Sequence, residues 1–154
     1  MTNEDDIAFL ERIPILRRLG APALRILAIS AESYHVEPGQ VLFSAGETAE
    51  GAYIVQRGSI NLQSEQPGAA AIIAAPGTLL GESALLAETR RSATATARED
   101  STVLRISRAM FLKMLEGYPD AAQRLREMIA ARTDQWERDM ASVRATLASG
   151  TKPQ

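Results

Sequence analysis

The chain has 154 residues, with 17 lysines and arginines against 19 aspartates and glutamates, which gives a formal net charge of −2 at pH 7. Hydrophobic residues make up 45% of it and charged residues 23%, a composition typical of one folded domain and not of a disordered or fibrous chain. No overall positive field exists to attract nucleic acid or an anionic membrane, so any anion binding must rest on a local group of cations.

Two residue counts exclude classes of chemistry. The chain has no cysteine, which removes disulfides, thiolate nucleophiles and cysteine-based metal sites. His35 is the single histidine, so imidazole-based metal centres, including those of metal-dependent β-barrel oxygenases and isomerases, are excluded. We therefore expect neither an enzyme nor a metal or other cofactor. His35 itself fits a strand-edge or packing position.

The N-terminus gives an expectation about location. Residues 1–6 carry acids where a secretory signal peptide needs bases, and no apolar run approaches the roughly 18 residues of a membrane span. We expect a cytoplasmic protein with no membrane partner.

Residues 1–33 are predicted to be an N-terminal helical segment. Apolar residues recur there at helical spacing, and Pro14 and the Gly20-Ala21-Pro22 stretch divide the segment into two or three short helices.

Residues 34–106 change to short β-type runs separated by turn residues such as Pro38-Gly39 and Pro76-Gly77. The predicted strands are 34–36, 41–43, 52–56, 59–63, 70–75 and 103–106. This spacing indicates an α+β fold, mainly β, built on an antiparallel β-roll or jelly-roll barrel. Tyr53, Ile54 and Val55 are expected in its strands and core. Residues 78–86 interrupt the rhythm with one or two helical turns.

Helical periodicity returns at residues 107–149, which are predicted to form C-terminal helices. Ser107 is the expected N-cap of the first, and a longer helix restarts at Pro119-Asp120. A heptad-like stripe follows the longer helix through Leu125, Ile129, Arg132, Trp136, Met140, Val143 and Leu147. The stripe predicts a homodimer seam. Residues 150–154 are expected to fray.

The stretch with the clearest chemistry is Gly81-Glu82-Ser83-Ala84-Leu85-Leu86, followed after four residues by Arg91-Ser92-Ala93-Thr94. Gly81 permits a tight turn, and Ser83 and Ala84 are small enough for a ligand to reach the amides that begin a short helix. Arg91 offers a forked guanidinium and Ser92 a hydroxyl donor. This pattern predicts an anion pocket.

Glu82 is unexpected in an anion pocket, because a carboxylate repels phosphate. A carboxylate does accept a strong hydrogen bond from a sugar hydroxyl. Glu82 and Arg91 together therefore indicate a ligand that carries a phosphate and a free hydroxyl side by side.

Residues 81–96 resemble the phosphate-binding cassette of cyclic nucleotide-binding domains, which occur in catabolite-activator-type regulators, kinase regulatory subunits and nucleotide-gated channels. Further matches follow in the family's order at residues 43–47, 52–60, 76–77 and 104–107, with Phe111 and Leu115. The resemblance spans residues 10–135 and places the cassette at residues 80–96.

The resemblance implies a role for each site residue. Glu82 would bind the ribose 2′-hydroxyl, while Arg91 and the backbone around Gly81, Ser83 and Ala84 would bind the phosphate with help from Ser92. Leu62 and Ile72 would lie near the ribose and purine. The family usually covers the purine from the helix after the roll, where Arg132 and Trp136 are the candidates. Trp136 also fits the apolar stripe, and we favour packing there.

Two positions depart from the family pattern. Arg90 stands where proline is frequent, so the loop before Arg91 is expected to be less rigid and gains a charge. Ser83 stands where an apolar residue is usual, and either adds a donor or faces solvent.

We therefore expect a stand-alone cyclic nucleotide receptor, with cAMP as the ligand and cGMP as the alternative that Ser92 does not settle. No DNA partner is expected, because a helix-turn-helix domain needs about seventy further residues. Ligand binding would rearrange the C-terminal helix toward a dimer mate or an unidentified effector protein. The alternative is a degenerate, non-binding fold that acts as a dimeric interaction scaffold.

Overall fold

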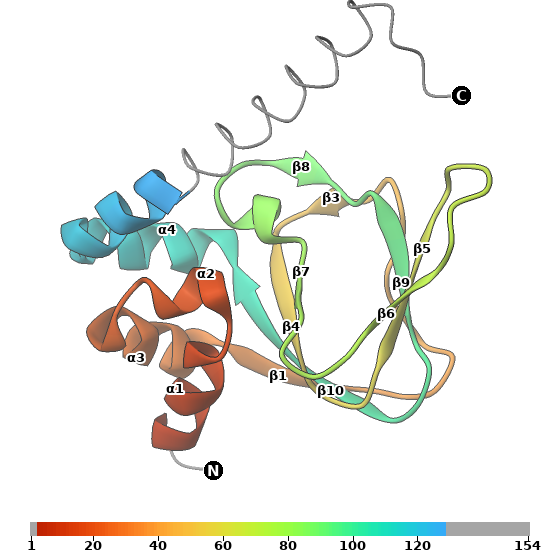
Figure 1. Ribbon diagram of the computed structural model, residues 1–154, viewed down its shortest axis with the longest axis horizontal. Coiled ribbons are helices and arrows are strands. Elements are labelled where there is room, and N and C mark those ends of the chain that lie inside the picture. The colour runs from red at the N-terminus through yellow and green to blue at the C-terminus, as the bar shows by residue number, and fades with distance from the viewer. Residues whose placement is uncertain (1–2, 129–154) are drawn as a thin grey trace, which may run out of the picture.

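A computed structural model describes residues 3–128 of the chain, with side chains from Asp6 onward. Helices gather at one side of the molecule and strands form a roll at the other (Figure 1). The expected α+β class with a majority of β-structure is confirmed. The part of the chain that is described contains no helix that combines the length and apolar character needed to cross a membrane.

Three short helices open the chain, as the proline and glycine positions predict. They are α1 (Asn3–Glu11), α2 (Pro14–Arg17) and α3 (Ala21–Ser30). Proline stands in the first turn of α2 and of α3, where its missing N–H costs no helical hydrogen bond. Gly20 precedes α3 with a φ of 91°, a left-handed conformation that glycine adopts without strain.

The roll consists of short antiparallel strands. They are β1 (Glu32–Val36), β2 (Val41–Phe43), β3 (Thr48–Ala49), β4 (Gly51–Arg57), β5 (Ile60–Ser64), β6 (Ile72–Ala74), β7 (Leu79–Leu80), β8 (Thr89–Arg90), β9 (Ala93–Ala97) and β10 (Ser101–Ser107). Two four-stranded sheets, ordered β1-β10-β4-β7 and β2-β9-β5-β6, accompany the pair β3-β8. The expected antiparallel β-roll is confirmed, and no ladder joins its sheets into a closed barrel within residues 3–128.

Four strands escape the sequence pattern. β3, β7 and β8 contain two residues each, too few for an alternation to show. β9 does alternate, as Ala-Thr-Ala-Thr-Ala, but alanine has low strand propensity and its small side chain marks no core face. Every strand that the sequence predicts is present, with ends shifted by a few residues.

The central strands β4 and β10 contribute side chains to two hydrophobic cores, because successive side chains of a strand point to opposite faces of the sheet. Ile54 and Leu104, which are register partners, pack with the helices. Val55 and Val103, the next pair along, lie in the cluster inside the roll. The sheet β1-β10-β4-β7 is therefore the wall between the helices and the interior of the roll.

The chain leaves the roll directly into α4 (Arg108–Gly117). The predicted cap is confirmed, because the Ser107 hydroxyl accepts a hydrogen bond from the Met110 N–H at 3.2 Å. Residues 119–128 are helical again, as the Pro119-Asp120 signal predicts. Arg124 ties this helix to the N-terminal helices by donating to the Arg18 and Leu19 carbonyls at 2.7 and 2.9 Å.

The rest of the predicted stripe, both candidate purine lids, Arg132 and Trp136, and the tail at 150–154 lie outside the described residues.

Candidate functional site

The predicted helical interruption is a single 3-10 turn, η1 (Glu82–Leu85), between β7 and β8. Leu85 is 1% exposed and packs into the helical core, so it fixes the turn against the rest of the molecule. Gly81 precedes the turn in a left-handed conformation, with a φ of 75°. A Cβ at this position would collide with Nη1 of Arg91. Glycine is therefore required both by backbone geometry and by the approach of the arginine.

A hollow of about 200 Å³ lies beside this turn. Six of the predicted site residues line it: Leu62, Gly81, Ser83, Ala84, Arg91 and Ser92. The others in its wall are Phe43, Ala49, Thr78, Leu79, Leu80, Thr89, Arg90 and Ala93. Segments from β2, β5 and the cassette thus meet around one space, which the sequence order alone does not reveal.

Two predicted site residues lie next to the hollow and not in its wall. Glu82 is partly buried between Gly81 and Ser83. Ile72 is 65% exposed on the edge strand β6, where the register places it opposite Leu62. Because register partners share a face of the sheet, Ile72 extends the apolar surface that Leu62 begins.

The Arg91 guanidinium is held on an aromatic platform. Its Cζ lies 4.3 Å from the ring centroid of Phe43 and 5.6 Å from that of Tyr53, and the two rings stack at 5.8 Å. Nη2 donates to the Gly51 carbonyl at 2.8 Å. Burial lowers the pKa of Arg91, whereas the charges of Tyr53 and Glu47 act in the other direction and raise it. Arginine nevertheless stays protonated in proteins.

Nη1 of Arg91 is buried and has no hydrogen-bond partner. A buried donor without an acceptor costs about 1–3 kcal/mol, so native proteins rarely keep one. Arg91 lines the hollow and its cation is partly desolvated, so the unmatched N–H is chemically suited to an anionic oxygen.

The loop before Arg91 is held by several hydrogen bonds, although Arg90 stands where proline is frequent in the family. The Arg90 side chain donates from Nη1 to the Gly46 carbonyl at 2.9 Å. The Arg91 N–H donates to the Glu47 carbonyl, and the Gly46 N–H donates to the Arg91 carbonyl, both at 2.8 Å. Pairing of β3 with β8 adds Thr48 opposite Arg90. Hydrogen bonds thus supply the order that a proline ring would give.

The backbone donors of η1 are partly used. The Ala84 N–H donates to the Gly81 carbonyl at 3.0 Å and closes the turn. Of the two amides that the sequence points to, that of Ser83 is the one left for a ligand. The Ser92 side chain is exposed at the rim of the hollow.

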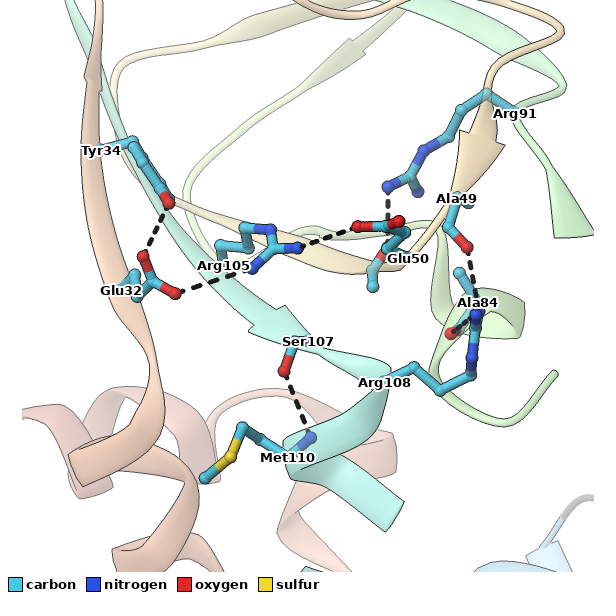
Figure 2. Close-up of polar contacts among 11 residues, drawn as sticks. Glu32, Tyr34, Ala49, Glu50, Ala84, Arg91, Arg105, Ser107, Arg108 and Met110 are labelled. Atoms are coloured by element: carbon cyan, nitrogen blue, oxygen red, sulfur yellow. Dashed lines mark hydrogen bonds and ion pairs between the residues drawn. The ribbon is translucent and has the colours of Figure 1, made fainter. Parts of the chain in front are cut away.

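Arg108 connects the cassette to α4, and sequence reasoning missed it. Its Nη1 lies 2.9 Å from the Ala49 carbonyl and 3.2 Å from that of Ala84 (Figure 2). The same atom lies 3.1 Å from the Ala87 carbonyl. Its own N–H donates to the Glu50 carbonyl at 2.8 Å. An arginine in the first turn of a helix gives no sequence signal for such contacts, because its acceptors are backbone carbonyls of distant segments.

Near the aromatic platform, a series of polar side chains links β1, β10 and the residue before β4. Arg105 lies 3.6 Å from a carboxylate oxygen of Glu32 and 3.9 Å from one of Glu50 (Figure 2). The Tyr34 hydroxyl donates to Glu32 at 2.7 Å, and this hydrogen bond raises the pKa of Tyr34. His35 lies on the edge strand β1, largely exposed and 3.5 Å from Asp100. Residues 3–128 hold no group of three or more histidines and acids placed to bind a metal ion.

Comparison with known proteins identifies the family. The family model described as the cyclic nucleotide-binding domain matches residues 34–118, more than half of the chain. This chain belongs to the cyclic nucleotide-binding domain family. The matched region contains the roll, the cassette and α4.

Individual relatives agree with this assignment. An uncharacterized NTE family protein of Mycobacterium tuberculosis is 36% identical over 110 residues, which is 71% of this chain and 19% of the relative. A cyclic AMP receptor protein of Thermus thermophilus is 32% identical over 116 residues, 73% of this chain and 54% of the relative. The solved structure of a cyclic nucleotide-binding-like protein from Brucella abortus has 38% identity and a TM-score of 0.65, and the match covers 73% of this chain and 98% of that chain.

This cyclic nucleotide-binding domain thus spans a fifth of the mycobacterial relative and about half of the Thermus receptor. The similarity extends to the shared domain and not to the whole length of those proteins.

Proposed function

We propose that this cyclic nucleotide-binding domain is a receptor for cAMP, and that occupancy of its hollow changes how the helices after residue 107 are seated. The buried and unmatched Nη1 of Arg91 carries this proposal. A cyclic phosphodiester supplies the anionic oxygen that this buried donor lacks. The similarity to the cyclic AMP receptor protein of Thermus thermophilus supports cAMP over cGMP.

The sugar and base have partners of matching chemistry. Glu82 follows Gly81 directly and would turn its carboxylate to the ribose 2′-hydroxyl. Leu62 and the exposed Ile72 would be covered by the rest of the nucleotide. Removing such apolar surface from water contributes about 25 cal/mol per Å² to binding.

Arg108 gives the hollow a route to the C-terminal helices. Its guanidinium contacts the carbonyls of Ala84 and Ala87, which belong to the cassette, while its backbone begins α4. A shift of η1 on ligand binding would therefore change the contacts that seat the first turn of α4. A ligand that binds one arrangement better than the other shifts the population between them.

Calorimetric titration with cAMP and cGMP tests the binding proposal. We expect saturable binding of cAMP by the wild-type chain, stronger than that of cGMP. Glu82→Ala should weaken cAMP binding by about 1.5–3 kcal/mol through loss of a hydrogen bond to a charged group. Thermal unfolding gives an independent reading, because ligand at about 100 times its dissociation constant adds about 2.7 kcal/mol to the folded state. Binding of neither nucleotide would contradict the proposal and leave the dimeric scaffold as the better account.

Hydrogen exchange tests the coupling. Ligand should change the protection of α4 amides in the wild type, and Arg108→Met should abolish that change while cAMP still binds, because methionine keeps the helical stem without the guanidinium. Arg105→Met is the matched control, since Arg105 pairs with Glu32 and Glu50 and contacts no cassette carbonyl. An unchanged response in Arg108→Met would contradict the coupling route alone.

A further inference from the structure

The wall of the hollow contains a second cation beside Arg91. Arg90 lines the same space, and its side chain is exposed where that of Arg91 is half-buried. Neither arginine forms a salt bridge with a carboxylate of the described residues. The wall of the hollow therefore includes two adjacent arginines that form no salt bridge with a described carboxylate, although Glu47 lies close enough to Arg91 to raise its pKa.

The donors around the hollow leave room for this second cation. Arg91 has committed Nη2 to the Gly51 carbonyl, so it offers Nη1 to a ligand. The amide of Ala84 is committed to the Gly81 carbonyl. A phosphodiester has two non-bridging oxygens that share one negative charge, and each oxygen can accept more than the single hydrogen bond that Nη1 of Arg91 or the Ser83 N–H would give it.

Arg90, in the wall of the same hollow, can add a further donor and a second positive charge. Its backbone is fixed by pairing of β8 with β3, and its Nη1 is anchored on the Gly46 carbonyl at 2.9 Å. Gly46 in turn donates its N–H to the Arg91 carbonyl, so the residue that anchors the Arg90 side chain is itself bound to the backbone of Arg91. The remaining N–H groups of the Arg90 guanidinium stay available, because this side chain donates from several positions at once.

We propose that Arg90 is a second phosphate-binding residue, on the solvent side of Arg91, and that it raises the affinity of the pocket most for phosphates of higher negative charge. This inference rests on the proposed function and assigns a specificity to the same site. A phosphate monoester carries about −1.5 to −2 charges at pH 7, against one for a cyclic diester. Coulomb attraction scales with that charge, so Arg90 favours the monoester more than the diester.

The test compares cAMP with 5′-AMP in calorimetric titrations of the whole chain. Arg90→Gln removes the charge and keeps an N–H donor for the Gly46 carbonyl, while Arg90→Lys keeps the charge. Arg98→Gln is the matched control, because Arg98 is an exposed arginine beyond the far end of β9.

We expect Arg90→Gln to weaken cAMP binding about threefold and 5′-AMP binding about tenfold, as an exposed charge contact acting on single and nearly double charge should. Both losses should shrink in high salt. Arg90→Lys should retain most of the affinity and Arg98→Gln all of it.

Unchanged cAMP affinity in Arg90→Gln would overturn the inference, as would an equal loss in Arg98→Gln, which would indicate a general charge effect. If 5′-AMP does not compete with cAMP for the wild-type chain, the proposed preference for higher charge is wrong. If the wild-type chain binds no nucleotide, the proposed function fails instead, so the two failures are distinguishable.

Discussion

Strand β9 joins two polar clusters of opposite character. Beyond its end, Ser59, Glu99 and Ser101 satisfy one another: the Ser59 hydroxyl donates to Glu99 at 2.7 Å, and the Ser59 N–H donates to the Ser101 hydroxyl at 3.1 Å. Before its start, Arg91 is half-buried with one N–H group unmatched. Polar atoms are removed from water in both places, but only in the first do hydrogen bonds within the protein replace those lost to water.

The difference separates structure from function. When every donor and acceptor of a cluster is matched within the protein, the hydrogen bonds fix the turn without a ligand, which suits a position whose role is stability. A buried donor without an acceptor lowers stability and persists where another selective pressure keeps it. Mutations in the two clusters should therefore act on different measurements, ligand affinity at one end of β9 and unfolding at the other.

The largest effect is expected from Arg91→Ala. Loss of the guanidinium leaves the ligand's phosphate without its buried partner, which should cost about 2–5 kcal/mol of cAMP affinity in calorimetry. The free energy of unfolding without ligand should change much less, because loss of the contacts with the aromatic platform and the Gly51 carbonyl is offset by removal of the buried, unmatched N–H. Unchanged affinity would show that Arg91 does not bind the ligand. The contrast between the two ends of β9 would then fail as well.

Gly81→Ala should affect both measurements at once. A non-glycine residue in this left-handed conformation costs about 1–3 kcal/mol of folding stability, measurable by urea denaturation. The added methyl group would also displace Nη1 of Arg91, so cAMP affinity should fall together with stability. Gly68→Ala is a matched control, because Gly68 also has positive φ but has open space around its Cα. A loss of affinity in the control would show that backbone strain alone is responsible.

Ser101→Ala tests the satisfied cluster. Ser101 is 1% exposed, and without its hydroxyl the buried Ser59 N–H has no acceptor. The free energy of unfolding should fall by about 1–3 kcal/mol. Affinity for cAMP should stay that of the wild type, and a parallel loss of affinity would show that the two ends of β9 are not independent.

Ser59→Ala should give the smallest effect. It removes one hydrogen bond, to a glutamate that is itself exposed, and leaves no backbone group unmatched. The expected loss in urea denaturation is about 0.5–1.5 kcal/mol, with no change in binding. A loss larger than that of Ser101→Ala would mean that the side-chain contact, and not backbone satisfaction, holds the turn.

Sequence periodicity predicts much of the fold because the core is periodic. The alternation of β4 is visible in the sequence at Ile54 and Val55. Ser107 predicts the start of α4, because its hydroxyl can cap the first turn of a helix. The sequence predicts the roll but not whether its sheets close into a barrel, because closure depends on pairing between strand edges, which leaves no mark in the residues. β9 was missed because alanine and threonine alternate without a large apolar side chain.

The candidate site divides in the same way. Gly81, Ser83 and Arg91 lie within one short stretch of the chain, so their chemistry can be interpreted as one motif. The platform of Phe43 and Tyr53 and the link through Arg108 join segments that are far apart in sequence. Only the fold brings these groups together, and no local pattern encodes a contact between a guanidinium and a distant ring or carbonyl.

A crystal structure of the chain with cAMP is the most direct test of the central claim. The account predicts that a phosphate oxygen lies about 2.7–2.9 Å from Nη1 of Arg91, the distance of a charge-assisted hydrogen bond. A nucleotide bound away from residues 81–92, or one bound there with Nη1 still unmatched, would contradict it.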